Sequence, residues 1–307
     1  DTNAQINDNN FTVSLSETTD GGMTISSSFK LMDENAAAGD IDAGLTLAFT
    51  DGSKLDVLNA GNASASHAVS VPGSAGAEGV TVTSTNSAPT GLDFMTASTA
   101  FGVEYHSAAD FFADGLKMSI SASTDSGAGA EATYRVDSHY AIGATYVTDL
   151  GDSAVTLGAG WSGSEGSKNG ATAITNDPGG IHIGVSAVTG DLTVAVGFAD
   201  GDDIGSTGTA TNDVEIDGEV VKAGVKYVSG DLTFNVGVVS GEANDSTTIG
   251  TAGTTTDSYD KTSASVSYAV ASGVTAILGY SSVDSSDEGA NDDKDGSSWY
   301  IGANMSF

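Results

Sequence analysis

The chain has 307 residues, with 41 Gly, 3 Pro and no Cys, and it carries 41 Asp+Glu against 9 Lys+Arg. The formal net charge of −32 excludes nucleic acid as a partner, because almost nothing would neutralise the phosphates, and it favours cations. The absence of Cys excludes thiolate metal sites and disulfides. No run of about 18 apolar residues occurs, which excludes a transmembrane helix but not a barrel whose lipid-facing residues alternate with others.

Short segments of alternating apolar and polar residues predict an all-β chain, and its length does not require a second domain. We therefore treat residues 1–307 as one domain. In the first half, strands are expected near 9–16, 22–32, 40–50, 53–59, 97–107 and 114–124. They are followed by 139–148, 153–163, 180–189, 191–200, 218–229, 231–241, 257–269, 272–284 and 297–307.

The second half repeats a hairpin with a period of about forty residues, because Gly151, Gly190, Gly230 and Gly273 each lie in a tight turn between two alternating runs. The opposite connections are long and polar, over 164–179, 201–217, 242–256 and 284–296. Short turns at one end and long loops at the other are typical of a membrane barrel. The alternative, a propeller, would need four shorter strands in each repeat.

The predicted fold is a transmembrane antiparallel β-barrel of about sixteen strands, because closed barrels of this kind have an even number. Fifteen strands are visible in the sequence. The missing strand would precede residue 9, where DTNAQINDNN has the character of a loop.

Alternation assigns one face of each strand to lipid and the other to the lumen. In 22–32, for example, Ile25 and Phe29 share the apolar face and Lys30 has the opposite parity. The inward basic residues predicted in this way are Lys30, Lys54, Lys117, Lys222, Lys226 and Lys261. Asp42, Asp56, Glu104, His106 and His182 are predicted to share the lumen wall with them. The alternative is that such charges simply face water, as in a soluble sandwich.

Aromatic residues are spaced as two interfacial rings. Tyr146, Tyr227 and Tyr268 stand three to five residues before a short turn, and Trp161, Phe198 and Tyr280 stand seven to ten residues after one. The chain ends WYIGANMSF, with Trp299, Ile301, Met305 and the terminal Phe307 in phase. A terminal aromatic on an amphipathic last strand resembles the signal for barrel insertion.

With these features, the chain resembles the trimeric general porins of alphaproteobacteria from about residue 11 to Phe307, including TTDGGMTISSSFKLMD and the closing GANMSF. The resemblance implies a homotrimer in the outer membrane of a Gram-negative bacterium, in contact with lipid and lipopolysaccharide. It also implies that a long loop, here 60–93, folds into the pore. The family's loop carries acidic groups opposite a basic wall. Here the loop offers only Glu78 and Asp93, with His67, opposite Lys30 and Lys54, so we expect a weaker field across the constriction.

Motifs of hydrolases, metalloproteases and nucleotide-binding proteins are absent, so no enzyme activity and no cofactor are expected. Asn291, Asp293 and Asp295 have the spacing that begins a calcium loop, but the twelfth position is Gly302 instead of Glu. An EF-hand is thereby rejected, and only weakly bound Ca²⁺ is considered, the simpler alternative being a solvated acidic loop.

The expected function is passive diffusion of small hydrophilic solutes and ions through a constriction, with a mild cation preference set by the acidic mouth. Two alternatives stay open. A calcium-stabilised structural or adhesive surface protein would also explain the acidic composition, and a gated or substrate-specific channel would share the fold.

Overall fold

The computed structural model describes residues 10–33, 44–57, 61–73, 88–92, 102–124, 135–167, 179–206, 215–245, 255–286 and 293–305. They contain one short 3-10 helix, η1 (Ala65–His67), and fifteen strands. The strands are β1 (Asn10–Thr18), β2 (Thr24–Asp33), β3 (Leu45–Ala48), β4 (Lys54–Val57), β5 (Gly102–His106), β6 (Leu116–Thr124), β7 (Arg135–Leu150), β8 (Ser153–Ser167), β9 (Gly179–Thr189), β10 (Leu192–Ser206), β11 (Glu215–Ser229), β12 (Leu232–Asp245), β13 (Thr255–Ala271), β14 (Val274–Ser286) and β15 (Lys294–Met305).

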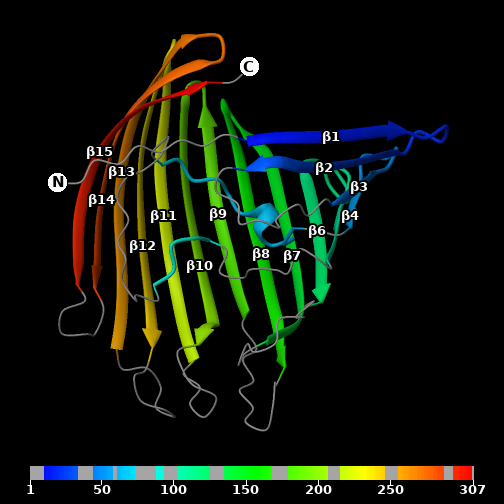
Figure 1. Cartoon of the computed structure of the whole chain (residues 1–307), viewed down its shortest axis with the longest axis horizontal. Helices are drawn as coiled ribbons and strands as arrows, with labels where there is room; N and C mark the ends of the chain where they lie inside the picture. The colour runs from blue at the N-terminus through cyan, green and yellow to red at the C-terminus, as the bar shows by residue number, and fades with distance from the viewer. Residues whose placement is uncertain are drawn as a thin grey trace.

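All fifteen strands form one antiparallel sheet in which each strand pairs with its neighbours in the sequence, from β1 to β15 (Figure 1). The prediction of fifteen antiparallel strands is confirmed. Within the described residues, β1 and β15 are the two ends of this ladder. The strand expected before residue 9 lies outside the described residues.

The long strands extend further than the apolar alternation predicted. β10 and β11 remain paired beyond Asp200↔Glu219 as far as Ser206↔Glu215, so residues 201–206 and 215–217 of the predicted loop are strand. Backbone hydrogen bonds continue a two-stranded ribbon whatever its side chains are, whereas the apolar alternation is needed only where the strand meets lipid. The prediction therefore underestimated the length of the ribbons.

The short turns are built on glycines with positive φ, as the sequence indicated. Gly151, Gly190 and Gly230 have φ of 65°, 55° and 58°, each at the first central position of a two-residue turn followed by Asp. Gly at this position is the requirement of a type II′ hairpin turn, whose twist matches that of the flanking strands.

The outer face of the sheet is apolar and exposed. Ile183 is 61 % exposed, Leu278 50 % and Ile301 87 %, which would be unfavourable in water and is expected of side chains that meet lipid. The rings of Tyr280 and Trp299, from neighbouring strands, pack on this face with centroids 4.8 Å apart. No helix in the described part of the chain is long and apolar enough to span a membrane.

We expect the substitution Ile183→Lys to impair folding into a bilayer by about 2–4 kcal/mol, because Ile183 lies on the outer face near the middle of β9. Ser186→Lys, on the opposite face of the same strand, is the control and should fold nearly as well as the unmodified chain. Folding into liposomes, followed by heat-modifiable electrophoretic mobility, measures the difference. Equal folding of the two variants would contradict the assignment of the faces.

Candidate functional site

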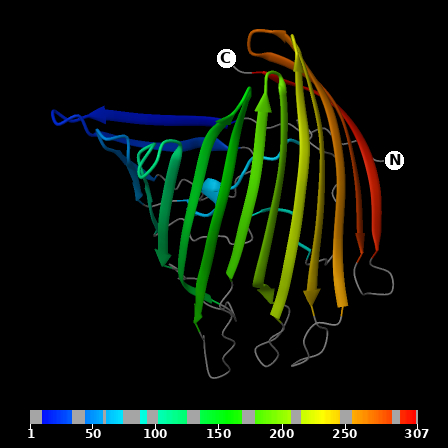
Figure 2. The same ribbon diagram turned by 180° about the vertical axis from the view of Figure 1, so that it is seen from behind.

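Two segments of the interval 60–93, residues 61–73 and 88–92, lie against the inner face of the sheet, the face opposite the exposed apolar side chains. Figure 1 shows η1 and these segments in front of the long strands, and Figure 2, from behind, shows them through the gaps between the strands. The described part of the predicted constriction loop is therefore inside the curved sheet. Residues 60, 74–87 and 93 lie outside the description.

Inward-facing glycines give the loop its place on the wall. A Cβ atom at Gly184 would lie 2.8 Å from the Cβ of Val69, and one at Gly237 would lie 2.6 Å from the carbonyl oxygen of Pro72. Side-chain atoms do not normally approach so closely, so any larger residue here would displace the loop. The other inward glycines that a loop residue closely covers are Gly143, Gly158, Gly160, Gly197, Gly224 and Gly241.

Hydrogen bonds from three strands hold the first segment in place. The amide of Ala63 donates to Ser121 Oγ on β6 (3.0 Å), and Ser66 Oγ donates to Glu104 Oε1 on β5 (2.7 Å). His182 Nε2–H on β9 donates to the carbonyl oxygen of Ser64 (2.8 Å). Hydrogen bonds to polar side chains of the strands thus hold the loop, and its backbone lies against the wall at the glycines.

His67, at the end of η1, is held between two strands. Its Nδ1 is 2.7 Å from Thr145 Oγ1 and its Nε2 is 2.8 Å from Ser119 Oγ. Burial is the main cause that lowers the pKa of His67 to about 4. The positive charges of His106, His182 and Lys117 lower this pKa further and are the lesser causes. His67 is therefore neutral at physiological pH, with one ring nitrogen donating and the other accepting.

Apolar contacts fix the second segment. Leu92 packs with Ala199 of β10 and Val220 of β11, and all three are almost completely buried. Ala68 and Val71 of the first segment pack against the same cluster. These apolar side chains of the inner face therefore contact the loop.

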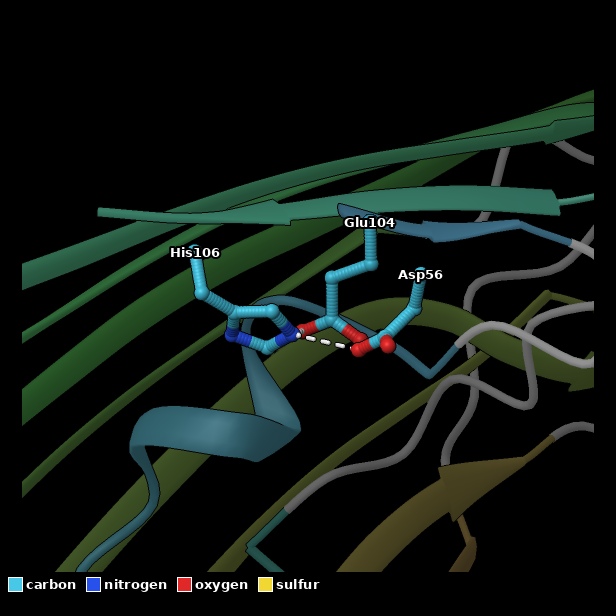
Figure 3. Close-up of side chains that lie close together, drawn as sticks. All are labelled: Asp56, Glu104 and His106. Atoms are coloured by element: carbon cyan, nitrogen blue, oxygen red, sulfur yellow. Dashed lines mark hydrogen bonds and ion pairs between the residues drawn. The ribbon is translucent and has the colours of Figure 1, made fainter. Parts of the chain in front are cut away.

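β4 and β5 bring four predicted site residues together, because their register pairs Lys54 with His106 and Asp56 with Glu104. His106 Nε2 is 3.0 Å from Asp56 Oδ2 and 3.5 Å from Glu104 Oε1 (Figure 3). Lys54 Nζ is 3.0 Å from the same oxygen of Asp56. The predicted basic wall is at this point a mixed cluster in which the lysine is neutralised by a neighbouring carboxylate.

The other predicted wall residues are dispersed. Lys117 is exposed on β6, and Lys222 and Lys226 lie on β11 at the parity opposite the exposed Val221 and Val225. His182 anchors the loop, as described above, and Lys261 is half-buried on β13. Asp293 and Asp295 are exposed at the start of β15. The side chain of Lys30, and Asp42, Glu78, Asp93 and Asn291 altogether, lie outside the described part of the structure.

The sequence did not lead us to expect that inward-facing glycines would contact the loop, or that His67 would anchor it. The sequence did contain a signal for this contact between loop and glycines. Gly recurs in the middle of strands at the positions predicted to face the lumen, in GAG (158–160), IGV (183–185) and VGV (236–238). A lumen wall exposed only to water would place Ser, Thr or charged residues at most of these positions. Nothing local indicated that His67 would meet Ser119 and Thr145, which are distant in the sequence.

We expect Gly184→Val to displace the loop, because its side chain would occupy the space now filled by Val69. Pore conductance should change, and proteolytic cleavage within 61–92 should become faster. Gly302→Val is the matched control. Gly302 also lies in a strand, but a Cβ atom added there would have no neighbouring atom within 4 Å. Bilayer conductance and limited proteolysis measure both effects. A Gly184→Val protein indistinguishable from the control would contradict the contact between the loop and Gly184.

We expect His67 to make stability depend on pH. Because its pKa in the folded protein, about 4, lies below its ordinary value of 6.5, the unfolded chain binds more protons between these values. The contribution is fully present above pH 6.5 and falls by up to about 3 kcal/mol as the pH decreases toward 4. Thermal unfolding of the unmodified protein and of His67→Gln isolates this term from that of the carboxylates. The two should differ in pH slope within this window, and parallel slopes would refute the assignment.

Comparison with solved structures shows a shared fold at low identity. A porin refined at 1.8 Å matches with TM-score 0.62 and 18 % identity over 96 % of this chain and 91 % of the other. OmpT of Vibrio cholerae, in its trimer form, matches with 0.62 and 14 % over 97 % and 91 %. An anion-selective porin from Comamonas acidovorans matches with 0.58 and 11 % over 96 % and 84 %. Comparison with curated proteins finds no match.

The family comparison is decisive. Residues 1–288 match the family described as Gram-negative porin, which confirms the resemblance inferred from the strand pattern and the chain end, and with it the outer-membrane location. The chain therefore belongs to the Gram-negative porins.

Proposed function

We propose that this porin is a general diffusion pore with a mild preference for cations, through which small hydrophilic solutes and ions pass without chemical change. The observation that carries the proposal is the loop seated on the inner wall by its backbone, anchored by Ser121, Glu104 and His182. A segment held at mid-wall narrows a channel without closing it, which suits size-limited diffusion.

The charge distribution supports the cation preference. The net charge is −32, and one of the predicted wall lysines, Lys54, is paired with Asp56. Free charges act on ions over a Debye length of about 8 Å at physiological salt, so an excess of carboxylates raises the local cation concentration. A porin described as anion-selective has the same fold, so side-chain charge, and not the barrel, would set the sign of the preference.

A homotrimer is part of the proposal, supported by the trimer form in which the related fold of OmpT was solved. The exposed apolar outer face would then divide between contacts with lipid and with neighbouring protomers, and lipopolysaccharide would surround the trimer. Weak Ca²⁺ binding near Asp293 and Asp295 stays a proposal of the same kind. Family membership favours a pore over the alternative of a structural surface protein.

Planar-bilayer recordings under a KCl gradient test the selectivity. We expect a reversal potential of the sign for cations, and we expect Lys117→Gln to increase the cation-to-anion permeability ratio by up to about twofold. One charge at about 8 Å in water, screened over one Debye length, contributes about 0.2 kcal/mol with opposite sign for a cation and an anion. Lys117 is chosen because it is exposed beside the loop residue His67. Both effects should shrink as salt is raised.

Lys226→Gln, near the short turn of β11, is the comparison and should change the ratio less. Anion preference in the unmodified protein would refute the proposed selectivity. Saturating conductance with one solute would favour the substrate-specific channel instead.

A further inference from the structure

A cluster of three potential metal ligands lies on the inner wall beside the loop. We propose that Asp56, Glu104 and His106 form a binding site for a divalent transition-metal ion of the Zn²⁺ class. One ligand atom of each residue lies within 4.8 Å of those of the other two, on the adjacent strands β4 and β5 (Figure 3). The argument for this site does not rest on the proposed ion selectivity.

The distances between the ligand atoms suit a small ion. Zn²⁺ bonded to nitrogen and oxygen at about 2.0–2.2 Å in a tetrahedron places its ligands about 3.4 Å from one another. His106 Nε2 is already 3.0 Å from Asp56 Oδ2 and 3.5 Å from Glu104 Oε1. The two carboxylate oxygens lie within 4.8 Å of each other, so occupation would draw the carboxylates together, with water completing the coordination.

Each ligand is oriented by a second residue, as metal ligands usually are. Ser119 Oγ is 2.9 Å from His106 Nδ1, which leaves Nε2 directed at the carboxylates. Thr46 donates a hydrogen bond to Asp56 Oδ1, and Ser66 of η1 donates to Glu104. These partners come from β3, β6 and the loop, so the cluster is pre-arranged before any ion binds.

Charge gives a reason for a cation at this place. Glu104 is only 2 % exposed and lies beside a second carboxylate, and a divalent ion offers these two groups more positive charge than a single imidazole can carry. Lys54 now supplies one positive charge to Asp56, but its side chain is 45 % exposed and is free to turn into the lumen. Lys54 would therefore compete with the metal ion.

The imidazole selects the class of metal. Ca²⁺ and Mg²⁺ prefer oxygen ligands, whereas Zn²⁺, Cu²⁺ and Ni²⁺ bind imidazole nitrogen well. Asp56 and His106 side chains are 17 % and 18 % exposed, which leaves a path from the lumen to the open coordination positions.

Metal binding is compatible with the docked loop. When His106 Nε2 binds an ion, its Nδ1–H donates to Ser119 Oγ, and the Ser119 hydroxyl then donates to His67 Nε2. His67 in turn donates from Nδ1 to Thr145 Oγ1. With these donors and acceptors, both histidines are neutral and each of their ring nitrogens has a partner. Because Ser119 and Ser66 each connect the cluster to the loop, binding of the ion and docking of the loop would stabilise each other.

Isothermal titration of the detergent-solubilised protein with Zn²⁺, in excess Mg²⁺ to occupy the surface carboxylates, tests the site. We expect one Zn²⁺ per chain, a loss of affinity of about 10-fold or more in His106→Gln, and a gain in Lys54→Met, from which the competing ammonium is removed. His139→Gln is the matched control. His139 is also a buried inner-face histidine, but it lies on β7, two strands from His106.

Heat-modifiable mobility first establishes that every variant is folded. A folded His106→Gln protein that binds Zn²⁺ like the unmodified chain, equal loss in His139→Gln, or no binding at all would overturn the proposal. Cu²⁺ electron paramagnetic resonance is the second readout, and coupling to one nitrogen that disappears in His106→Gln is the expected result. Because neither measurement needs ion flow, failure of the site and failure of the proposed pore function are distinguishable.

Discussion

The backbone hydrogen-bond ladder is the constraint on which the rest of the structure depends. In hydrocarbon no water is available to satisfy peptide groups, so a spanning chain without long apolar helices must pair its strands with one another. Here every strand pairs with its sequence neighbours in one sheet. That pairing sets a period of two, and from the period follow both the exposed apolar outer face and an inner face available for other contacts.

On the inner face, glycines determine where the loop lies. Glycines such as Gly158, Gly184 and Gly224 let the backbone of 61–73 lie directly on the strands. Polar anchors then set its position, and the apolar cluster around Leu92 adds burial that a water-filled wall would lack. The described segments, 61–73 and 88–92, carry no Asp, Glu, Lys or Arg, so in the proposed constriction they would contribute backbone and small side chains.

The charged cluster at β4 and β5 shows how register creates chemistry. Asp56 and His106 are fifty residues apart in the sequence and meet because their strands are neighbours with a defined register. Ser119 then joins His106 to His67, so a single hydroxyl links the wall cluster to the loop segment 61–73. The cluster therefore contacts, through Ser119, the segment that we propose narrows the pore.

The sequence by itself determined the strand number, the face of each strand and the short turns, because these depend on local periodicity and on glycines such as Gly190. It also indicated the family, through the spacing of aromatic residues and the chain end. Only the tertiary structure decided that Gly184 contacts Val69, that His67 lies between Ser119 and Thr145, and that Lys54 pairs with Asp56. These contacts join residues distant in sequence, and no local pattern specifies which positions a long loop will meet when it folds back onto a wall.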